Sequence, residues 1–327
     1  MADADRVCEL FKTNYLTVRT EFAAFSGGYM HPFCAALYAL AGRTLDAASL
    51  GAVCAGIKET TGRFSPFRGA TLLGYAAALD LSGDPEPLLA DVERTHGLLR
   101  VGLRDTAYLP QAAFVIEKFC PPSEREELCR GVTELVRGAA LRRPLLAGSE
   151  NAALFALALC SGRREDEILD RMERCYTDLR RDCDAYAAQA LALVLSLGGE
   201  DAMALCERFR RFGLALSSKG IRTGRGIELS AAALLSLSGL DGLAAADAVW
   251  ELDRALGRVK GLGNFALGRK RRAMFCCLLA SALADGAPVY VPGRRASFAP
   301  VELAAEAALF CALSVCAGSS AAMRSTV

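Results

Sequence analysis

The sequence predicts an all-α protein in which about seven helix pairs stack into an α/α superhelix or toroid, with an N-terminal helix capping one end. The chain of 327 residues is 53% hydrophobic but only 7% aromatic, and its abundance of Ala and Leu suits close helix packing better than strands. Helix-breaking residues also recur at near-constant steps of about 40 residues, each between a strongly apolar segment and a charged one. The breaks lie at Gly42, Gly83, Pro121, Gly162, Gly198 and Gly239.

The expected helices fall into two types. A helix from Asp3 to Phe25 is expected to cap the array, and the segment before each break is apolar nearly all round, which indicates an inner layer buried on several sides. These apolar segments begin at Pro32, Ala70, Ala112, Ala152, Tyr186 and Leu229. The segment after each break instead alternates apolar and charged residues at helical spacing, so one face is expected to meet solvent. This second type covers residues 88–99, 128–141, 165–180, 203–216 and 245–259.

The C-terminal part continues and then interrupts this pattern. A seventh apolar helix is predicted over Arg271–Ala284, an extended loop or small hairpin over 287–298, and a last helix from about Pro300 to Ala317 that closes the array. No linker divides the chain. We therefore expect residues 1–327 to form a single continuous helical-repeat domain.

The charge and the cysteine content of the sequence limit the classes of function that we expect. The 38 basic and 37 acidic residues nearly cancel, so we expect no nucleic-acid or membrane partner to be recruited by an overall field. None of the 13 cysteines forms a C-x-x-C pair, and most lie on apolar stripes, which indicates reduced core thiols. The start, Met1-Ala-Asp-Ala-Asp-Arg, lacks the basic region of a secretory signal, and a cytoplasmic location is expected.

The segment Lys58-Glu-Thr-Thr-Gly-Arg-Phe-Ser-Pro-Phe-Arg-Gly-Ala resembles an uncharacterised bacterial family of domains of unknown function, the 4003 type. The resemblance rests on the Gly62–Arg68 stretch and on the overall length. It implies a bacterial cytosolic protein, and it brings no activity or catalytic residue that could be transferred.

The motifs of common enzymes are missing from the sequence. It contains no phosphate-binding G-x-x-x-x-G-K-[ST] loop, no H-E-x-x-H helix and no G-x-S-x-G elbow. Only His31 and His96 are present, so a multi-histidine metal site or a Ser-His-Asp triad is not expected, and no cofactor is implied. We interpret His31 as a solvated or backbone-bonded loop residue and His96 as a surface residue.

The segment Arg63-Phe-Ser-Pro-Phe-Arg68 is the most unusual local feature. Ser65 is a candidate cap for the following helix, with Pro66 at its first position. Cations at a helix N-terminus oppose the helix dipole, so Arg63 and Arg68 suggest an anion held between them and the exposed N–H groups. The simpler interpretation, which we favour at this point, pairs both arginines with acids such as Glu59 or Glu21.

Basic residues recur before two later apolar helices. Lys219, Arg222 and Arg225 precede the helix at Leu229, and residues 269–272, Arg-Lys-Arg-Arg, precede the helix at Met274. If these helix starts line one rim of the array, Arg63, Ser65, Arg68, Arg225 and Arg271 form a candidate ligand-binding set. The corresponding starts of other repeats carry acids, and a charged, solvated rim is the alternative interpretation.

Two function hypotheses follow. The first is a non-enzymatic scaffold that binds a protein partner on a concave face, as stacked helical repeats commonly do. The second is an enzyme or small-molecule-binding protein that recognises an anionic ligand at an Arg-lined end of the array, with Glu228 or Asp80 as a possible acid or base.

Overall fold

The structure is a computed structural model that describes all residues except 1, 24–29, 145–147, 224–227, 239 and 284–327. Its described part contains the α-helices α1 to α14, short 3₁₀ turns and no strand, which confirms the predicted all-α class. The predicted hairpin at 287–298 and the last helix at Pro300–Ala317 lie outside the described residues.

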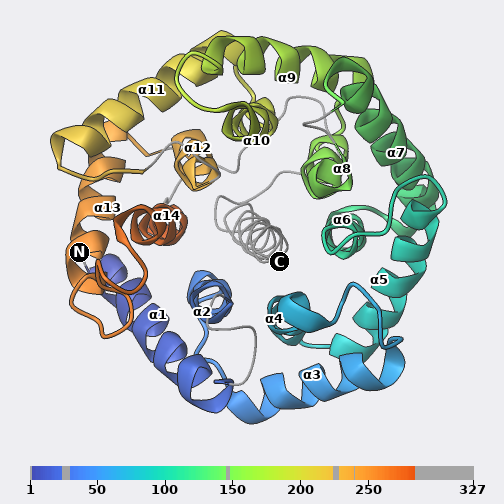
Figure 1. Cartoon of the computed structure of the whole chain (residues 1–327), viewed down its shortest axis with the longest axis horizontal. Coiled ribbons are helices and arrows are strands. Elements are labelled where there is room, and N and C mark those ends of the chain that lie inside the picture. The colour runs from blue at the N-terminus through green and yellow to red at the C-terminus, as the bar shows by residue number, and fades with distance from the viewer. Residues whose placement is uncertain (1, 24–29, 145–147, 224–227, 239, 284–327) are drawn as a thin grey trace, which may run out of the picture.

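Helices alternate between an outer and an inner position along the chain (Figure 1). The outer helices are α1 (Ala2–Glu21), α3 (Ala47–Thr60), α5 (Pro85–Arg100), α7 (Arg125–Arg142), α9 (Glu165–Leu179), α11 (Ala202–Ser218) and α13 (Gly242–Leu256). The inner helices are α2 (His31–Leu40), α4 (Leu72–Ser82), α6 (Leu109–Phe119), α8 (Ala152–Cys160), α10 (Ala185–Ser196), α12 (Leu229–Leu237) and α14 (Arg269–Ala280). The first and last pairs lie side by side, since α13 packs against α1 and α14 packs against α2 (Figure 1).

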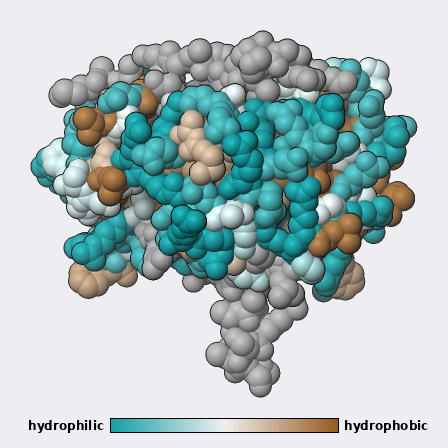
Figure 2. All heavy atoms as spheres, turned by 90° about the horizontal axis from the view of Figure 1, so that it is seen from above, coloured by the Kyte–Doolittle hydropathy of each residue, from teal (hydrophilic) through white to brown (hydrophobic). Residues whose placement is uncertain are grey.

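Burial separates the two kinds of helix as the residue pattern predicts. Every residue of α2, α8 and α12 is buried, consistent with apolar residues on all their faces. Helix α9 instead buries Ile168, Met172, Cys175 and Leu179 along one face. The space-filling side view accordingly shows a mainly hydrophilic surface with isolated hydrophobic residues (Figure 2).

The described cysteines are all free and buried. Burial raises the pKa of the Cys54 thiol to about 11 and that of Cys277 to about 12. Because a protonated thiol is a poor nucleophile, these residues act as small hydrophobic core residues, as the sequence predicts. Cys311 and Cys316 lie outside the described residues.

The connections between helices differ in length at the two ends of the array. Each inner helix leads to the next outer helix through a short segment, such as residues 41–46, 161–164 or 197–201. Most outer helices lead to the next inner helix through a longer segment, such as 61–71, 101–108 or 257–268. We call the two sides the short-connection end and the long-connection end.

Hydrogen bonds join neighbouring helix pairs at each end. At the short-connection end, Arg43 Nη1 donates to the Leu81 carbonyl over 3.3 Å. At the long-connection end, Ser149 Oγ donates to the Arg104 carbonyl over 2.8 Å, and Arg19 Nη1 donates to the Lys260 carbonyl over 2.8 Å. The two sets of connections therefore form two separate surfaces.

Acidic residues cap the outer helices at the short-connection end. The Asp46 side chain accepts from the N–H groups of Ala48 and Ser49, and the Asp241 side chain accepts from those of Leu243 and Ala244. These bonds satisfy donors that have no partner within the helix, and the negative charge favours the positive end of the helix dipole.

Candidate functional site

The residues singled out in the sequence at 63–68 lie in the long connection between α3 and α4. Arg68 Nε donates to Thr61 Oγ1 over 3.1 Å, whereas no hydrogen bond or ion pair engages the exposed Arg63 side chain among the described residues. Neither arginine forms an ion pair with Glu59 or Glu21. The pairing that we favoured from the sequence is therefore wrong.

Ser65 does not cap the inner helix. A 3₁₀ turn at Gly69–Thr71 separates it from α4, which begins at Leu72, and Ser65 Oγ accepts only a long 3.4 Å bond from the Phe67 N–H. Gly69, the first residue of this turn, has a positive φ of 73°, a backbone conformation that glycine adopts without steric cost. The predicted cap is wrong because the sequence does not reveal this extra turn.

Phe67 anchors the same loop in the core and brings it to His96. The Phe67 ring packs edge-on against the His96 ring, with ring centroids 5.5 Å apart. His96 is buried, and its Nε2 lies 3.0 Å from Asp105 Oδ1. Burial lowers the pKa of His96, and the nearby Asp105 carboxylate opposes this effect. The expectation of a surface His96 is therefore wrong, because the charged sequence around it hides its buried face.

His31 is the first residue of α2 rather than a loop residue. It is buried, and its Nε2 lies 3.0 Å from the Phe22 carbonyl oxygen. Of the interpretations open from the sequence, the structure therefore supports the backbone-bonded one.

The candidate acid Asp80 is held in a structural network. Tyr38 Oη donates to Asp80 Oδ2 over 2.5 Å, and Ser49 Oγ donates to Oδ1. Burial and the bond to this carboxylate raise the pKa of Tyr38. Because Asp80 is buried and joins α2, α3 and α4, its contacts give it a packing role rather than access to a ligand.

A cationic cavity lies where α12 and α14 begin. Its volume is about 430 Å³, and four of its lining residues are basic. The lining residues are Arg222, Glu228, Leu267, Gly268, Arg269, Lys270 and Arg271. Gly268 has a positive φ of 84° at the position before α14, and no side chain caps the first turn of this helix. The cavity thus combines cations with the positive end of a helix dipole, an arrangement that favours an anion.

The structure brings together only part of the predicted site. Arg271 lines the cavity, whereas Arg63, Ser65 and Arg68 are not among its lining residues, and Arg225 lies outside the described residues. The other charged residues of the lining are Arg222, Glu228, Arg269 and Lys270. The recurrence of basic residues before the helices at Leu229 and Met274 was the signal that identified this region.

Arg272, the next residue in the basic run, has a different role. Its Nε lies 2.6 Å from Asp253 Oδ1, and its Nη1 donates to Asn264 Oδ1 over 2.8 Å. The side chain is almost fully buried, so it fastens the 257–268 connection to α13 and does not line the cavity. One step along α14 therefore separates a structural arginine from a cavity-lining one.

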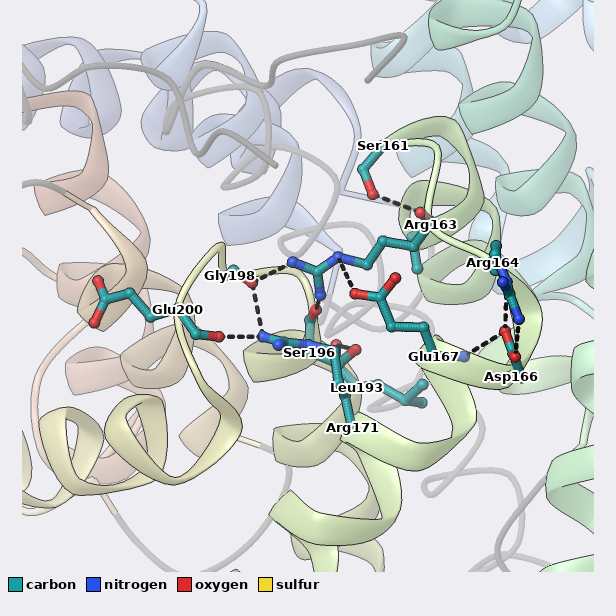
Figure 3. A network of polar contacts seen from close by, with 11 residues as sticks. Ser161, Arg163, Arg164, Asp166, Glu167, Arg171, Leu193, Ser196, Gly198 and Glu200 are labelled. Carbon is teal, nitrogen blue, oxygen red and sulfur yellow. Dashed lines mark hydrogen bonds and ion pairs between the residues drawn. The ribbon is translucent and has the colours of Figure 1, made fainter. Parts of the chain in front are cut away.

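A second cavity of about 420 Å³ lies near Arg163 and Arg164 at the short-connection end. The buried Arg163 donates to the carbonyls of Ser196 and Gly198, and Arg171 donates to those of Gly198 and Glu200 (Figure 3). Burial and the neighbouring Arg171 lower the pKa of Arg163 to about 10. These two guanidinium groups donate to carbonyls at the C-terminal end of α10 and just after it, where positive charge is favourable. Because their partners are carbonyls of the protein, we do not assign them to ligand binding.

A family described as a protein of unknown function (DUF4003) matches residues 14–283. The chain belongs to this family. The match spans nearly all of the described helices, including both cavities, and the family carries no assigned activity. No curated protein and no solved structure matches the chain.

Two further findings concern the described residues. They hold no group of three or more His, Cys, Asp or Glu side chains placed to bind a metal ion. None of the helices in this part of the chain combines the length and apolar character needed to cross a membrane.

Proposed function

We propose that this DUF4003 protein is a non-enzymatic helical-repeat scaffold of the bacterial cytosol, closed into an α/α toroid, that recognises an anionic ligand at the start of α14. The packing of α13 on α1 and of α14 on α2 supports a closed ring. Since every residue of α2, α8 and α12 is buried, we assign recognition to an end of the array rather than to a concave inner face.

The observation that carries the proposal is the charge of the cavity. Arg222, Arg269 and Lys270 have no hydrogen-bonding or ion-pairing partner for their side chains among the described residues. They share the cavity with Arg271 and a single acid, Glu228. Several like charges in one concave site repel one another, and an anion relieves this repulsion while binding the N–H groups of the first turn of α14.

The dimensions of the cavity limit the ligand. A volume of about 430 Å³ suits a small molecule rather than a polymer segment. Arginine binds phosphate and carboxylate through two parallel hydrogen bonds, so a phosphorylated or carboxylated metabolite is the ligand class that we propose.

Thermal unfolding in the presence of inorganic phosphate and citrate tests this proposal. A ligand at 100 times its dissociation constant stabilises a protein by about 2.7 kcal/mol, so the midpoint of the wild-type protein should rise with anion concentration. The double variant Arg269→Gln/Lys270→Gln should lose most of this rise. The variant Arg164→Gln, which removes an exposed cation at the other end, is the matched control and should keep it. Equal responses of all three proteins would contradict the proposal.

A further inference from the structure

Strongly exposed apolar side chains concentrate at the long-connection end. Phe265 is fully exposed, Phe64 is 97% exposed, and Val101 and Leu141 are 89% and 86% exposed. Phe64 and Phe265 lie in the connections before α4 and α14, Val101 directly follows α5, and Leu141 lies in the last turn of α7. Tyr186, in the first turn of α10, belongs to the same end and is 67% exposed.

These residues are spread around the array rather than gathered in one groove. In Figure 1 the helices that flank them are distributed around the array: α4, α5 and α7 are neighbours, whereas α10 and α14 lie farther around it. Each residue therefore belongs to a different connection or helix terminus of the same end. Such an arrangement offers several apolar contact points to a broad surface, and it lacks the contiguous buried core of a typical protein–protein interface.

Basic residues accompany the exposed apolar residues. Arg63 precedes Phe64, and residues 257–271 around Phe265 include five basic residues and no acid, namely Arg258, Lys260, Arg269, Lys270 and Arg271. No hydrogen bond or ion pair within the described part of the chain engages the side chains of Arg63, Arg104 and Arg258. The near-zero net charge thus hides a local excess of positive charge at this end.

We propose that the long-connection end docks flat onto an anionic lipid bilayer, with Phe64 and Phe265 entering the interface and the surrounding cations facing the lipid headgroups. This peripheral contact goes beyond the binding of a small anion in the cavity and does not require it. Exposed aromatic rings among basic residues bind an anionic interface through both apolar burial and charge. The absence of a membrane-crossing helix in the described residues is compatible with surface docking.

Aliphatic side chains favour a bilayer over a nucleic acid. Val101 and Leu141 have no aromatic face on which bases stack, but they gain from burial near lipid chains. Nucleic-acid binding is therefore an outcome of the test rather than a second proposal.

The short-connection end is less suited to an anionic bilayer, and its exposed Leu243 provides a control for the two Phe residues. Leu243 is 64% exposed there, in the first turn of α13, but it lies beside the capping carboxylate of Asp241. Asp46 and Asp201 cap α3 and α11 at the same end. An anionic surface repels these carboxylates. At the long-connection end, among the described inner helices, α10 alone has a side-chain cap, from Asp184, so this end is better suited to face such a surface.

Sedimentation with lipid vesicles tests the docking. The wild-type protein should bind vesicles of phosphatidylcholine that contain about one-third phosphatidylglycerol. It should bind vesicles of phosphatidylcholine alone much more weakly, because each Lys or Arg near an anionic surface raises partitioning about fivefold. Phe64→Ser/Phe265→Ser should weaken binding at least tenfold without altering the phosphate response, because both rings are solvent-exposed and neither lines the cavity. Leu243→Ser should bind as the wild type does.

The other outcomes distinguish failure of the docking from failure of the anion site. If the wild-type protein responds to phosphate but binds no vesicles, docking is overturned and the anion site stands. If it binds vesicles but not phosphate, docking stands and the anion site fails. Equal binding by the wild-type and Phe variants overturns the proposed contact. Tight, salt-sensitive binding to a random DNA duplex without vesicle binding reassigns the surface to nucleic acid.

Discussion

The two ends of the helical array use arginine differently. At the short-connection end, Arg43, Arg163 and Arg171 donate to carbonyls near the C-termini of inner helices in the next repeat. At the long-connection end, Arg19 and Arg272 are also engaged by the protein, but Arg222 and Arg269 are exposed without side-chain partners among the described residues. We infer that the arginines bonded to carbonyls hold neighbouring helix pairs together, whereas the exposed arginines without partners contribute little to folding and are available for binding.

The largest expected effect follows from Arg163→Met. The substitution leaves the Ser196 carbonyl without the guanidinium donor and removes one of the two donors to Gly198. We expect a loss of about 3 kcal/mol in the free energy of unfolding, measured by urea denaturation. The neighbouring Arg164→Met is the control, because Arg164 is exposed and should leave the unfolding midpoint unchanged. Equal effects of the two substitutions would show that burial of Arg163 does not matter.

Asp80→Ala tests the second network near the short-connection end. It leaves the Tyr38 hydroxyl buried without its acceptor, so we expect a loss of about 2 kcal/mol in unfolding free energy. In a double-mutant cycle with Tyr38→Phe, the combined loss should be smaller than the sum of the single losses. Additive losses would contradict the direct bond.

Helix caps give a smaller contrast between the ends. Asp241→Ala removes two side-chain bonds at the start of α13 and should cost about 1 kcal/mol in thermal or urea unfolding. Glu228 precedes α12 at the long-connection end without a side-chain capping bond, so Glu228→Ala should change stability by less than about 0.5 kcal/mol. Because Glu228 is the acid of the cavity, its removal should also strengthen anion binding. Weaker phosphate binding by Glu228→Ala would oppose this assignment.

The smallest expected effect on stability belongs to the cavity cations. In buffer without multivalent anions, Arg269→Gln/Lys270→Gln should change the free energy of unfolding by less than about 0.5 kcal/mol, because both side chains are exposed and unpaired. Urea denaturation measures this directly. A large loss in the free energy of unfolding would show that Arg269 and Lys270 stabilise the fold, as Arg163 and Arg272 do.

The sequence predicts the fold better than the site. Helix periodicity and the recurrence of breaks locate the helices, because burial pattern is a local property of the chain. Arg271 and Arg272 are adjacent and chemically alike, yet only the distant Asp253 makes Arg272 structural. Likewise, the 3₁₀ turn that begins at Gly69, whose φ is positive, separates Ser65 from the start of α4. Partners that lie far away in sequence decide these roles, and a periodic pattern does not contain them.

Hydrogen–deuterium exchange measured with and without phosphate tests the division between the two ends most directly, because it reports on both in one experiment. We expect increased protection in peptides that cover 219–228 and 257–271, with no change in those that cover 161–171 and 196–201. Protection that rises equally at both ends, or only around Arg163, would contradict the assignment of anion binding to the long-connection end.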